Sequence, residues 1–112
     1  MKISKEKFEE IVYKKFISIP EEIRKKIENL EIIIEDNPPT NFLGLYHGVP
    51  FPKRKTSSYS LILPDRIVLF KKTIEKFCKT EEELEKLIEK VLLHEIGHYL
   101  GLDENSLKKL NL

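Results

Sequence analysis

The residues that could do chemistry most directly are two histidines and a glutamate in the motif H-E-x-x-H. His94 and His98 are four residues apart, so in a helix both imidazoles project from one face. This spacing can place two ring nitrogens about 2 Å from one zinc ion. Glu95 lies one residue round the helix, where its carboxylate can reach a water on the metal and act as the general base of a hydrolysis. The motif therefore predicts one Zn²⁺ per chain and hydrolytic chemistry.

A catalytic zinc site also needs a third protein ligand and an open fourth position. Gly101 follows the second histidine by three residues and allows the chain to turn sharply after the helix. Spacing then favours Glu104 as the third ligand, with Asp103 as the alternative if the turn is tighter. The remaining histidine, His47, lies in a predicted loop bounded by glycine and proline, and we expect it to lie away from the metal.

The histidines must be positioned by a helix, which the sequence predicts over residues 81–100. Thr80 and Glu83 form a capping-box pattern at its start, and Gly101 can take a positive φ at its end. Apolar residues at helical spacing surround the histidines, which predicts that this segment is buried. Because burying a carboxylate and two imidazoles is unfavourable unless they are paired or bound to a metal, the pattern also favours a metal ion.

The remaining segments predict an α+β fold with a small sheet. Apolar residues at helical spacing indicate helices, and β-branched runs bounded by glycine and proline indicate strands. The expected helices cover residues 5–18, 20–29 and 72–77, followed by a short helical segment at 104–110. The expected strands cover residues 31–35, 43–46 and 66–70, with 60–63 as a further candidate.

Length and composition predict one domain, residues 1–112, with a single core. The 20 Lys and Arg residues nearly balance the 19 Asp and Glu residues, so no overall field favours nucleic acid or an anionic membrane as a partner. No apolar run approaches the roughly 18 residues of a membrane span, and the charged first residues show no signal region. We therefore expect a cytoplasmic protein. The single cysteine, Cys78, cannot form an internal disulfide.

These motifs together resemble the small zincin-like metallopeptidases of bacteria and archaea, sometimes called minimal zincins. The similarity covers nearly the whole chain. It is carried by Pro20-Glu21-Glu22, the strand ending at Pro38-Pro39, Leu43-Gly44-Leu45-Tyr46, Gly48-Val49-Pro50, Leu63-Pro64-Asp65-Arg66-Ile67, and His94-Glu95-Ile96-Gly97-His98 with Gly101-Leu102.

The resemblance implies a minimal zincin-like domain, in which a small mixed sheet packs on N-terminal helices and a long C-terminal active-site helix. It also implies that His94, His98 and Glu104 are zinc ligands and that Glu95 is the catalytic base. The family usually has aspartate at the third ligand position, so Glu104 is a departure from its pattern. Any substrate groove is expected between residues 43–70 and the active-site helix.

The leading hypothesis is a zinc-dependent peptidase that hydrolyses a peptide or an unfolded protein. An extended substrate is expected to add along the exposed edge of the small sheet, where main-chain hydrogen bonds provide affinity without requiring a particular sequence. The alternative is a non-enzymatic, metal-containing module that binds a partner protein through residues 43–66. A third interpretation is a metal-dependent hydrolase of a substrate other than peptide.

Overall fold

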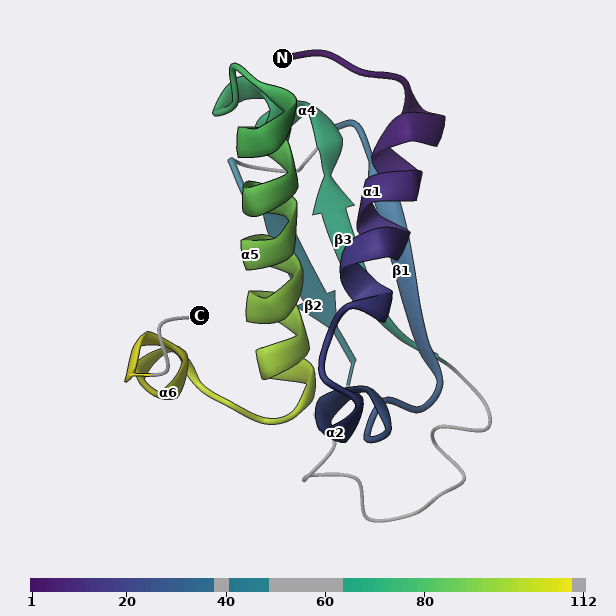
Figure 1. Ribbon diagram of the computed structural model, residues 1–112. Coiled ribbons are helices and arrows are strands. Elements are labelled where there is room, and N and C mark those ends of the chain that lie inside the picture. Colours follow the sequence, from purple (N-terminus) through teal and green to yellow (C-terminus); the bar gives the residue numbers. More distant parts are fainter. Residues whose placement is uncertain (38–40, 49–63, 110–112) are drawn as a thin grey trace.

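A small sheet lies behind two long helices in the computed structural model, which describes residues 1–37, 41–48 and 64–109 (Figure 1). The elements in chain order are α1 (Lys5–Ile17), α2 (Glu21–Arg24), β1 (Leu30–Glu35), β2 (Gly44–His47), β3 (Asp65–Phe70), α4 (Lys71–Lys76), α5 (Glu81–Tyr99) and α6 (Glu104–Lys109). The α+β class, the small mixed sheet and its packing against an N-terminal helix and a long C-terminal helix are confirmed.

Within residues 1–37, 41–48 and 64–109 the sheet has three strands, in the order β1-β3-β2. β1 runs parallel to the central strand β3, with Leu30 opposite Asp65, and β2 runs antiparallel to it, with His47 opposite Arg66. Among the described strands β2 therefore lies at one edge of the sheet, and it lies beside α5. This arrangement places β2 next to the helix that carries the H-E-x-x-H motif.

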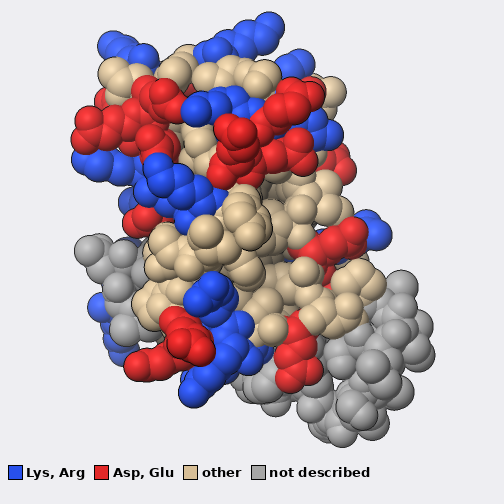
Figure 2. Space-filling model, turned by 45° about the vertical axis from the view of Figure 1, so that its right-hand side comes forward, with Lys and Arg blue, Asp and Glu red and all other residues tan. Residues whose placement is uncertain are grey.

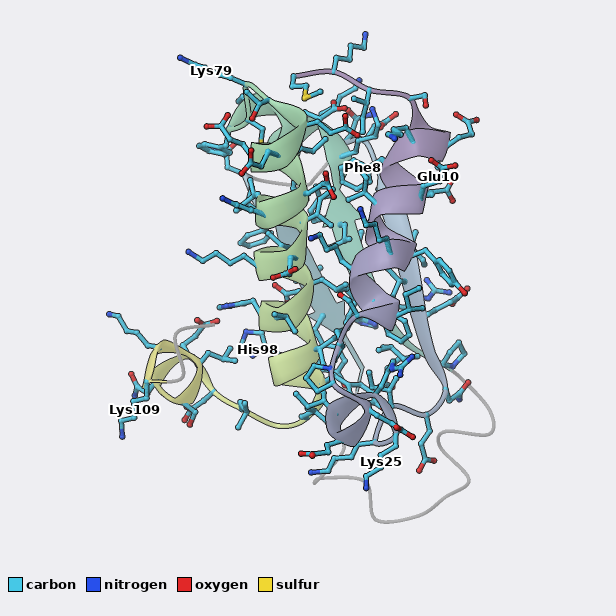
Figure 3. All side chains as sticks on the ribbon, viewed as in Figure 1. Phe8, Glu10, Lys25, Lys79, His98 and Lys109 are labelled. Carbon is cyan, nitrogen blue, oxygen red and sulfur yellow. The ribbon has the colours of Figure 1, made fainter. Side chains whose placement is uncertain are left out.

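The core lies between the sheet and the two long helices. Figure 3 shows Phe8 on the side of α1 that faces α5 and the sheet, and Glu10 on the opposite side. The fully buried side chains of the core come from α1, the central strand and α5. They include Phe8 of α1, Ile67 and Leu69 of β3, and Leu84, Ile88, Leu92 and Ile96 of α5. Both helices run in the same direction, and ion pairs Lys7–Glu81, Lys14–Glu85 and Lys15–Glu89 join α1 to the first half of α5.

Charged side chains of both signs lie intermingled on the face of the molecule drawn in Figure 2. This mixing agrees with the nearly equal numbers of acidic and basic residues in the sequence. Among the described helices, none combines the length and the apolar character that crossing a membrane requires.

The predicted second helix, residues 20–29, is wrong beyond its first turn. Helix α2 ends at Arg24, and the backbone N–H and C=O of Glu28 instead bind the hydroxyl of Tyr99, at 2.9 and 2.8 Å. Asn29 then adopts a positive φ of 51°, which turns the chain into β1. Helical periodicity in this segment is therefore overridden by a contact with the end of α5.

The predicted start of the active-site helix is confirmed in detail. Thr80 accepts a hydrogen bond from the backbone N–H of Glu83, and the Glu83 carboxylate accepts one from the backbone N–H of Thr80, so the capping box is complete. Gly101 has a φ of 93°, as a residue that ends a helix in the left-handed region should. The other predicted boundaries differ from the observed ones by at most one residue. The candidate strand at residues 60–63 and Leu110 lie outside the described residues.

Candidate metal centre

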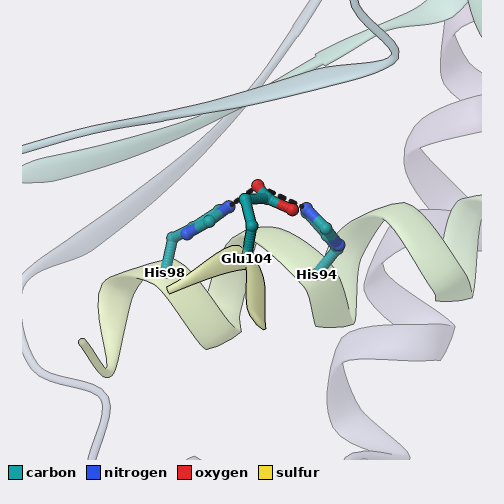
Figure 4. Close-up of side chains that lie close together, drawn as sticks. All are labelled: His94, His98 and Glu104. Carbon is teal, nitrogen blue, oxygen red and sulfur yellow. Dashed lines mark hydrogen bonds and ion pairs between the residues drawn. The ribbon is translucent and has the colours of Figure 1, made fainter. Parts of the chain in front are cut away.

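The last turns of α5 and the first residue of α6 bring His94, His98 and Glu104 together (Figure 4). Oε1 of Glu104 lies 2.8 Å from Nε2 of His98 and 3.3 Å from Nε2 of His94. The imidazole rings meet edge to face with their centroids 4.9 Å apart. All three candidate ligand atoms lie within 4.8 Å of one another. Two elements that follow each other in the chain thus produce a compact group of two nitrogens and one oxygen.

The chemistry and spacing of this group suit a zinc ion. Imidazole nitrogen and carboxylate oxygen are preferred zinc ligands, and ligands about 2 Å from a tetrahedral ion lie roughly 3.3 Å from one another. Nδ1 of His98 lies 3.1 Å from the carbonyl oxygen of Leu102, a contact that can hold this imidazole with Nε2 toward Glu104. Desolvation acts to raise the pKa of Glu104, but hydrogen bonds and charge from His94 and His98 outweigh it and lower the pKa. The carboxylate therefore stays ionised, as a metal ligand must.

The two acids considered for the third ligand have different surroundings. Asp103 precedes α6 and caps it, because its Oδ1 accepts a hydrogen bond of 2.8 Å from the backbone N–H of Ser106. Hydrogen bonds from Ser106, the largest influence, lower the pKa of Asp103. Of the two acids, the structure brings Glu104 to the histidines and uses Asp103 to start the helix that carries Glu104.

Helix α6 is held in place by a leucine seated on a glycine. Leu107 is fully buried, and a Cβ atom added to Gly97 of α5 would overlap with Leu107 Cδ2. A larger residue at position 97 would therefore push Leu107 outward. The glycine inside the H-E-x-x-H motif permits a close approach by a side chain of α6, and this contact places Glu104 near His94 and His98.

Glu95 points from the same helix into more enclosed surroundings beside β2. It is 8% exposed, and the backbone of Tyr46 forms a hydrogen bond with it. Gly44 lets α5 come close to β2, because a Cβ atom there would lie 2.7 Å from Val91 Cγ1 and 3.4 Å from Glu95 Cγ. Burial raises the pKa of Glu95, and the charges of the nearby histidines oppose this only in part. A carboxyl group with a raised pKa in a cleft is typical of residues that exchange protons.

Other candidate side chains serve the fold. His47 is the exposed last residue of β2 and not a loop residue as predicted, and it is not part of the histidine–glutamate group. The Tyr46 hydroxyl donates to Asp65 Oδ2 at 2.6 Å, and the Tyr99 hydroxyl donates to the Glu28 carbonyl oxygen. The two tyrosine rings pack edge to face at 6.0 Å. Tyr99 is therefore buried in the core, and Tyr46 is half-buried with its hydroxyl bound to Asp65.

A groove of about 810 Å³ surrounds the candidate metal centre. As predicted, part of its lining comes from the strand region, here residues 41–46, and part from α5. The sequence predicted an acid of residues 103–104 at this site, but not that Gly101 and Leu102 also line the groove. Gly101, which allows a sharp turn after the helix, is the signal in the sequence that this segment folds back beside the histidines.

Comparison with known proteins agrees with this geometry. Residues 19–112 match the model of the zincin-like metallopeptidase family. Among solved structures, a conserved hypothetical protein from Thermus thermophilus is similar in fold, with a TM-score of 0.60 and 19% identity. The match covers 87% of this chain and 94% of that one. No curated protein matches the sequence. Since the family match spans most of the chain, including both histidines and both acids, the protein belongs to the zincin-like metallopeptidase family.

Proposed function

We propose that this chain is a zinc-dependent peptidase in which His94, His98 and Glu104 hold one Zn²⁺ and Glu95 is the general base. The observation that carries the proposal is the meeting of three suitable ligand atoms beside a buried carboxylate that is not one of them. A purely structural zinc site usually has four protein ligands, whereas three ligands and a groove are typical of a catalytic site.

Bound in this centre, zinc would lower the pKa of a water molecule and polarise the carbonyl of the scissile bond. Glu95 accepts the proton that the attacking water loses, and then donates it to the amide nitrogen that leaves. Its raised pKa suits both roles, because the carboxyl group can hold the proton between the two transfers. The hydrogen bond from the Tyr46 backbone keeps the carboxylate oriented within the groove.

The substrate that fits this arrangement is an extended peptide. β2 lies at the edge of the sheet among the described strands and contributes residues 44–46 to the groove, while α5 forms the opposite wall. A peptide added along β2 forms main-chain hydrogen bonds with the strand and crosses the histidines with its backbone. Membership of a peptidase family supports the same class of substrate.

The decisive variant is Glu95→Gln, which keeps the shape of the side chain but removes the base. We expect its zinc content, measured by elemental analysis, to equal that of the wild type. Hydrolysis of a mixed peptide library, followed by mass spectrometry, should fall by about 10² to 10⁴. A chelated wild-type sample should lose activity to the same level.

Two controls bracket this experiment. Glu89→Gln makes the same change at an exposed position of α5 and should leave both zinc content and hydrolysis unchanged, while His94→Ala combined with His98→Ala should lose the zinc. Cleavage that persists in Glu95→Gln would contradict the mechanism. A wild type that retains zinc but cleaves no peptide would instead favour the non-enzymatic, metal-containing protein-binding module.

A further inference from the structure

The groove at the metal centre continues along α5 into a second hollow of about 440 Å³. Leu43, Leu87 and Lys90 line both. The second hollow, called the distal hollow below, also includes Phe77 and Lys86, which lie toward the start of α5. Figure 3 marks the two ends of this helix with Lys79 and His98. The two hollows therefore form one trough that follows α5 from the histidines toward its N-terminus.

The distal hollow has an apolar wall. Phe77 is 67% exposed, which is the largest exposure among the large apolar side chains of the described residues. Leu43 and Leu87 are half-buried beside it, and Cys78 is buried. An exposed aromatic ring at the edge of an apolar hollow is a favourable contact for a bulky apolar side chain of a ligand.

Two lysines supply positive charge along the same trough. Lys86 contacts Glu82 in an exposed ion pair of 3.3 Å, a type of pair that holds a lysine only weakly. Among the described residues, no carboxylate forms an ion pair with Lys90. The acid in the distal hollow, Glu83, accepts hydrogen bonds from the backbone N–H groups of Lys79 and Thr80. Two lysines and one acid line the distal hollow, so the net charge of its lining is positive.

The distance from the metal centre defines which part of a substrate could reach the distal hollow. Lys86 precedes His94 by two helical turns, which corresponds to about 12 Å along the helix axis. An extended peptide advances about 3.3 Å per residue. If the scissile bond of a substrate lies at the histidines, the residue about four positions from that bond would therefore reach the distal hollow.

We propose that the distal hollow is a substrate subsite that binds a bulky apolar side chain with a neighbouring carboxylate, three to five residues from the scissile bond. This inference rests on the proposed peptidase function and assigns its substrate class. Extended peptides with an aromatic–acidic pair at that distance are preferred over short peptides and over basic ones, since Phe77 contacts the ring and Lys86 and Lys90 attract the carboxylate.

Binding can be measured without turnover in zinc-loaded Glu95→Gln. The probes are fluorescein-labelled twelve-residue peptides that carry either a Phe-Asp pair, a Phe-Lys pair or a Gly-Ser pair in a Gly/Ser background. Fluorescence anisotropy should show the Phe-Asp peptide binding about tenfold more tightly than the Gly-Ser peptide. Adding Phe77→Ser should remove most of this preference, and adding Lys86→Glu should remove the part due to aspartate, more strongly at low salt.

Two matched variants act as controls. Tyr13→Ser removes an aromatic side chain on α1 that is 65% exposed, and Lys25→Glu reverses a charge next to α2, as labelled in Figure 3. Neither should alter the ranking of the peptides. If Phe77→Ser and Lys86→Glu also leave the ranking unchanged, the distal subsite is overturned.

Cleavage by the wild type separates this inference from the function on which it rests. In a peptide library, bulky apolar and acidic residues should be enriched three to five positions from the cut bond, and Phe77→Ser should abolish that enrichment. Cleavage without any such enrichment would overturn the subsite and leave the peptidase standing. Binding with the expected ranking but no cleavage of any peptide would refute the peptidase and leave the distal hollow as a peptide-binding site.

Discussion

Helices α5 and α6 both contribute to the candidate metal centre, but they are held in very different ways. α5 has a complete capping box, three ion pairs to α1 and several fully buried side chains against the sheet. α6 has six residues, one buried side chain, Leu107, and one side-chain cap, Asp103. His94, Glu95 and His98 therefore belong to the rigid scaffold, whereas Glu104 depends on a small element attached to it.

This difference suggests that the fold and the metal site can be disturbed separately. Changes in α6 should alter metal affinity while the core between α1, α5 and the sheet remains intact. Changes at the start of α5 should alter the free energy of unfolding of the protein and have little effect on the positions of the three candidate ligand atoms. The predictions below test this separation.

The largest effect is expected at the acid that contacts the histidines. Glu104→Ala removes a ligand atom, so zinc affinity should fall by more than the roughly 10- to 100-fold that is typical when only a supporting residue is lost. Asp103→Ala removes the cap of α6 and should weaken zinc binding by about tenfold, through a displaced Glu104. Competition with a fluorescent zinc chelator measures both affinities.

A matched variant sharpens the comparison between the two acids. Asp103→Asn keeps a side-chain oxygen that can accept the Ser106 hydrogen bond, so it should bind zinc nearly as well as the wild type. A greater loss of affinity in Asp103→Asn than in Glu104→Ala would assign the third ligand to Asp103.

An intermediate effect is expected where α6 rests on α5. Gly97→Ala improves helix propensity by about 1 kcal/mol, yet its Cβ displaces Leu107 and with it Glu104. We expect zinc affinity to fall about tenfold while the melting temperature of the metal-free protein falls little or rises. A purely structural role for Gly97 would lower both quantities together.

The double variant Gly97→Ala with Leu107→Ala tests whether the two residues act through one contact. The added methyl at position 97 partly fills the space that the shortened residue 107 leaves, so the second substitution should cost less affinity than it does in the wild type. Strictly additive losses would show that Gly97 does not act through Leu107.

The smallest effect is expected at the distant end of α5 and depends on pH. Hydrogen bonds from the backbone N–H groups of Lys79 and Thr80 hold the pKa of Glu83 below its ordinary value of 4.5. Because the folded-state pKa is lowered, this stabilisation is present above about pH 4.5 and is lost as the pH falls through the lowered value. Melting temperatures of the metal-free wild type should exceed those of Glu83→Gln at neutral pH and approach them in acid. A constant difference across this range would contradict the prediction.

Local signals in the sequence were sufficient to predict most of the helices and strands. The capping box, the glycine after α5 and the β-branched run of β1 are short-range features, and each produced the predicted element. The prediction of the second helix was wrong beyond Arg24 because Glu28 binds Tyr99, a partner far away in the sequence. Periodicity describes only the helix itself and has no information on such a partner.

At the candidate site, too, the features set by local sequence could be predicted, and those that depend on packing could not. Spacing alone predicted that two histidines and an acid could meet, because the histidines lie on one helix and the acid follows the turn at its end. Spacing favoured Glu104 but left Asp103 open as the alternative, since the choice depends on which residue starts α6. It also did not identify the side chains that approach Gly44 and Gly97, because a glycine in a sequence does not reveal which side chain will pack against it.

The three side chains drawn in Figure 4 are close in the sequence as well as in space. Glu104 is separated from His98 by 6 positions and from His94 by 10, so bringing them together closes only short loops. The surroundings of Glu95 depend on β2, whose pairing with β3 and packing against α5 join distant parts of the chain. Loop-closure entropy rises with the length of chain enclosed. Bringing Glu95, the proposed proton acceptor, beside β2 therefore costs more loop-closure entropy than bringing the three candidate ligands together.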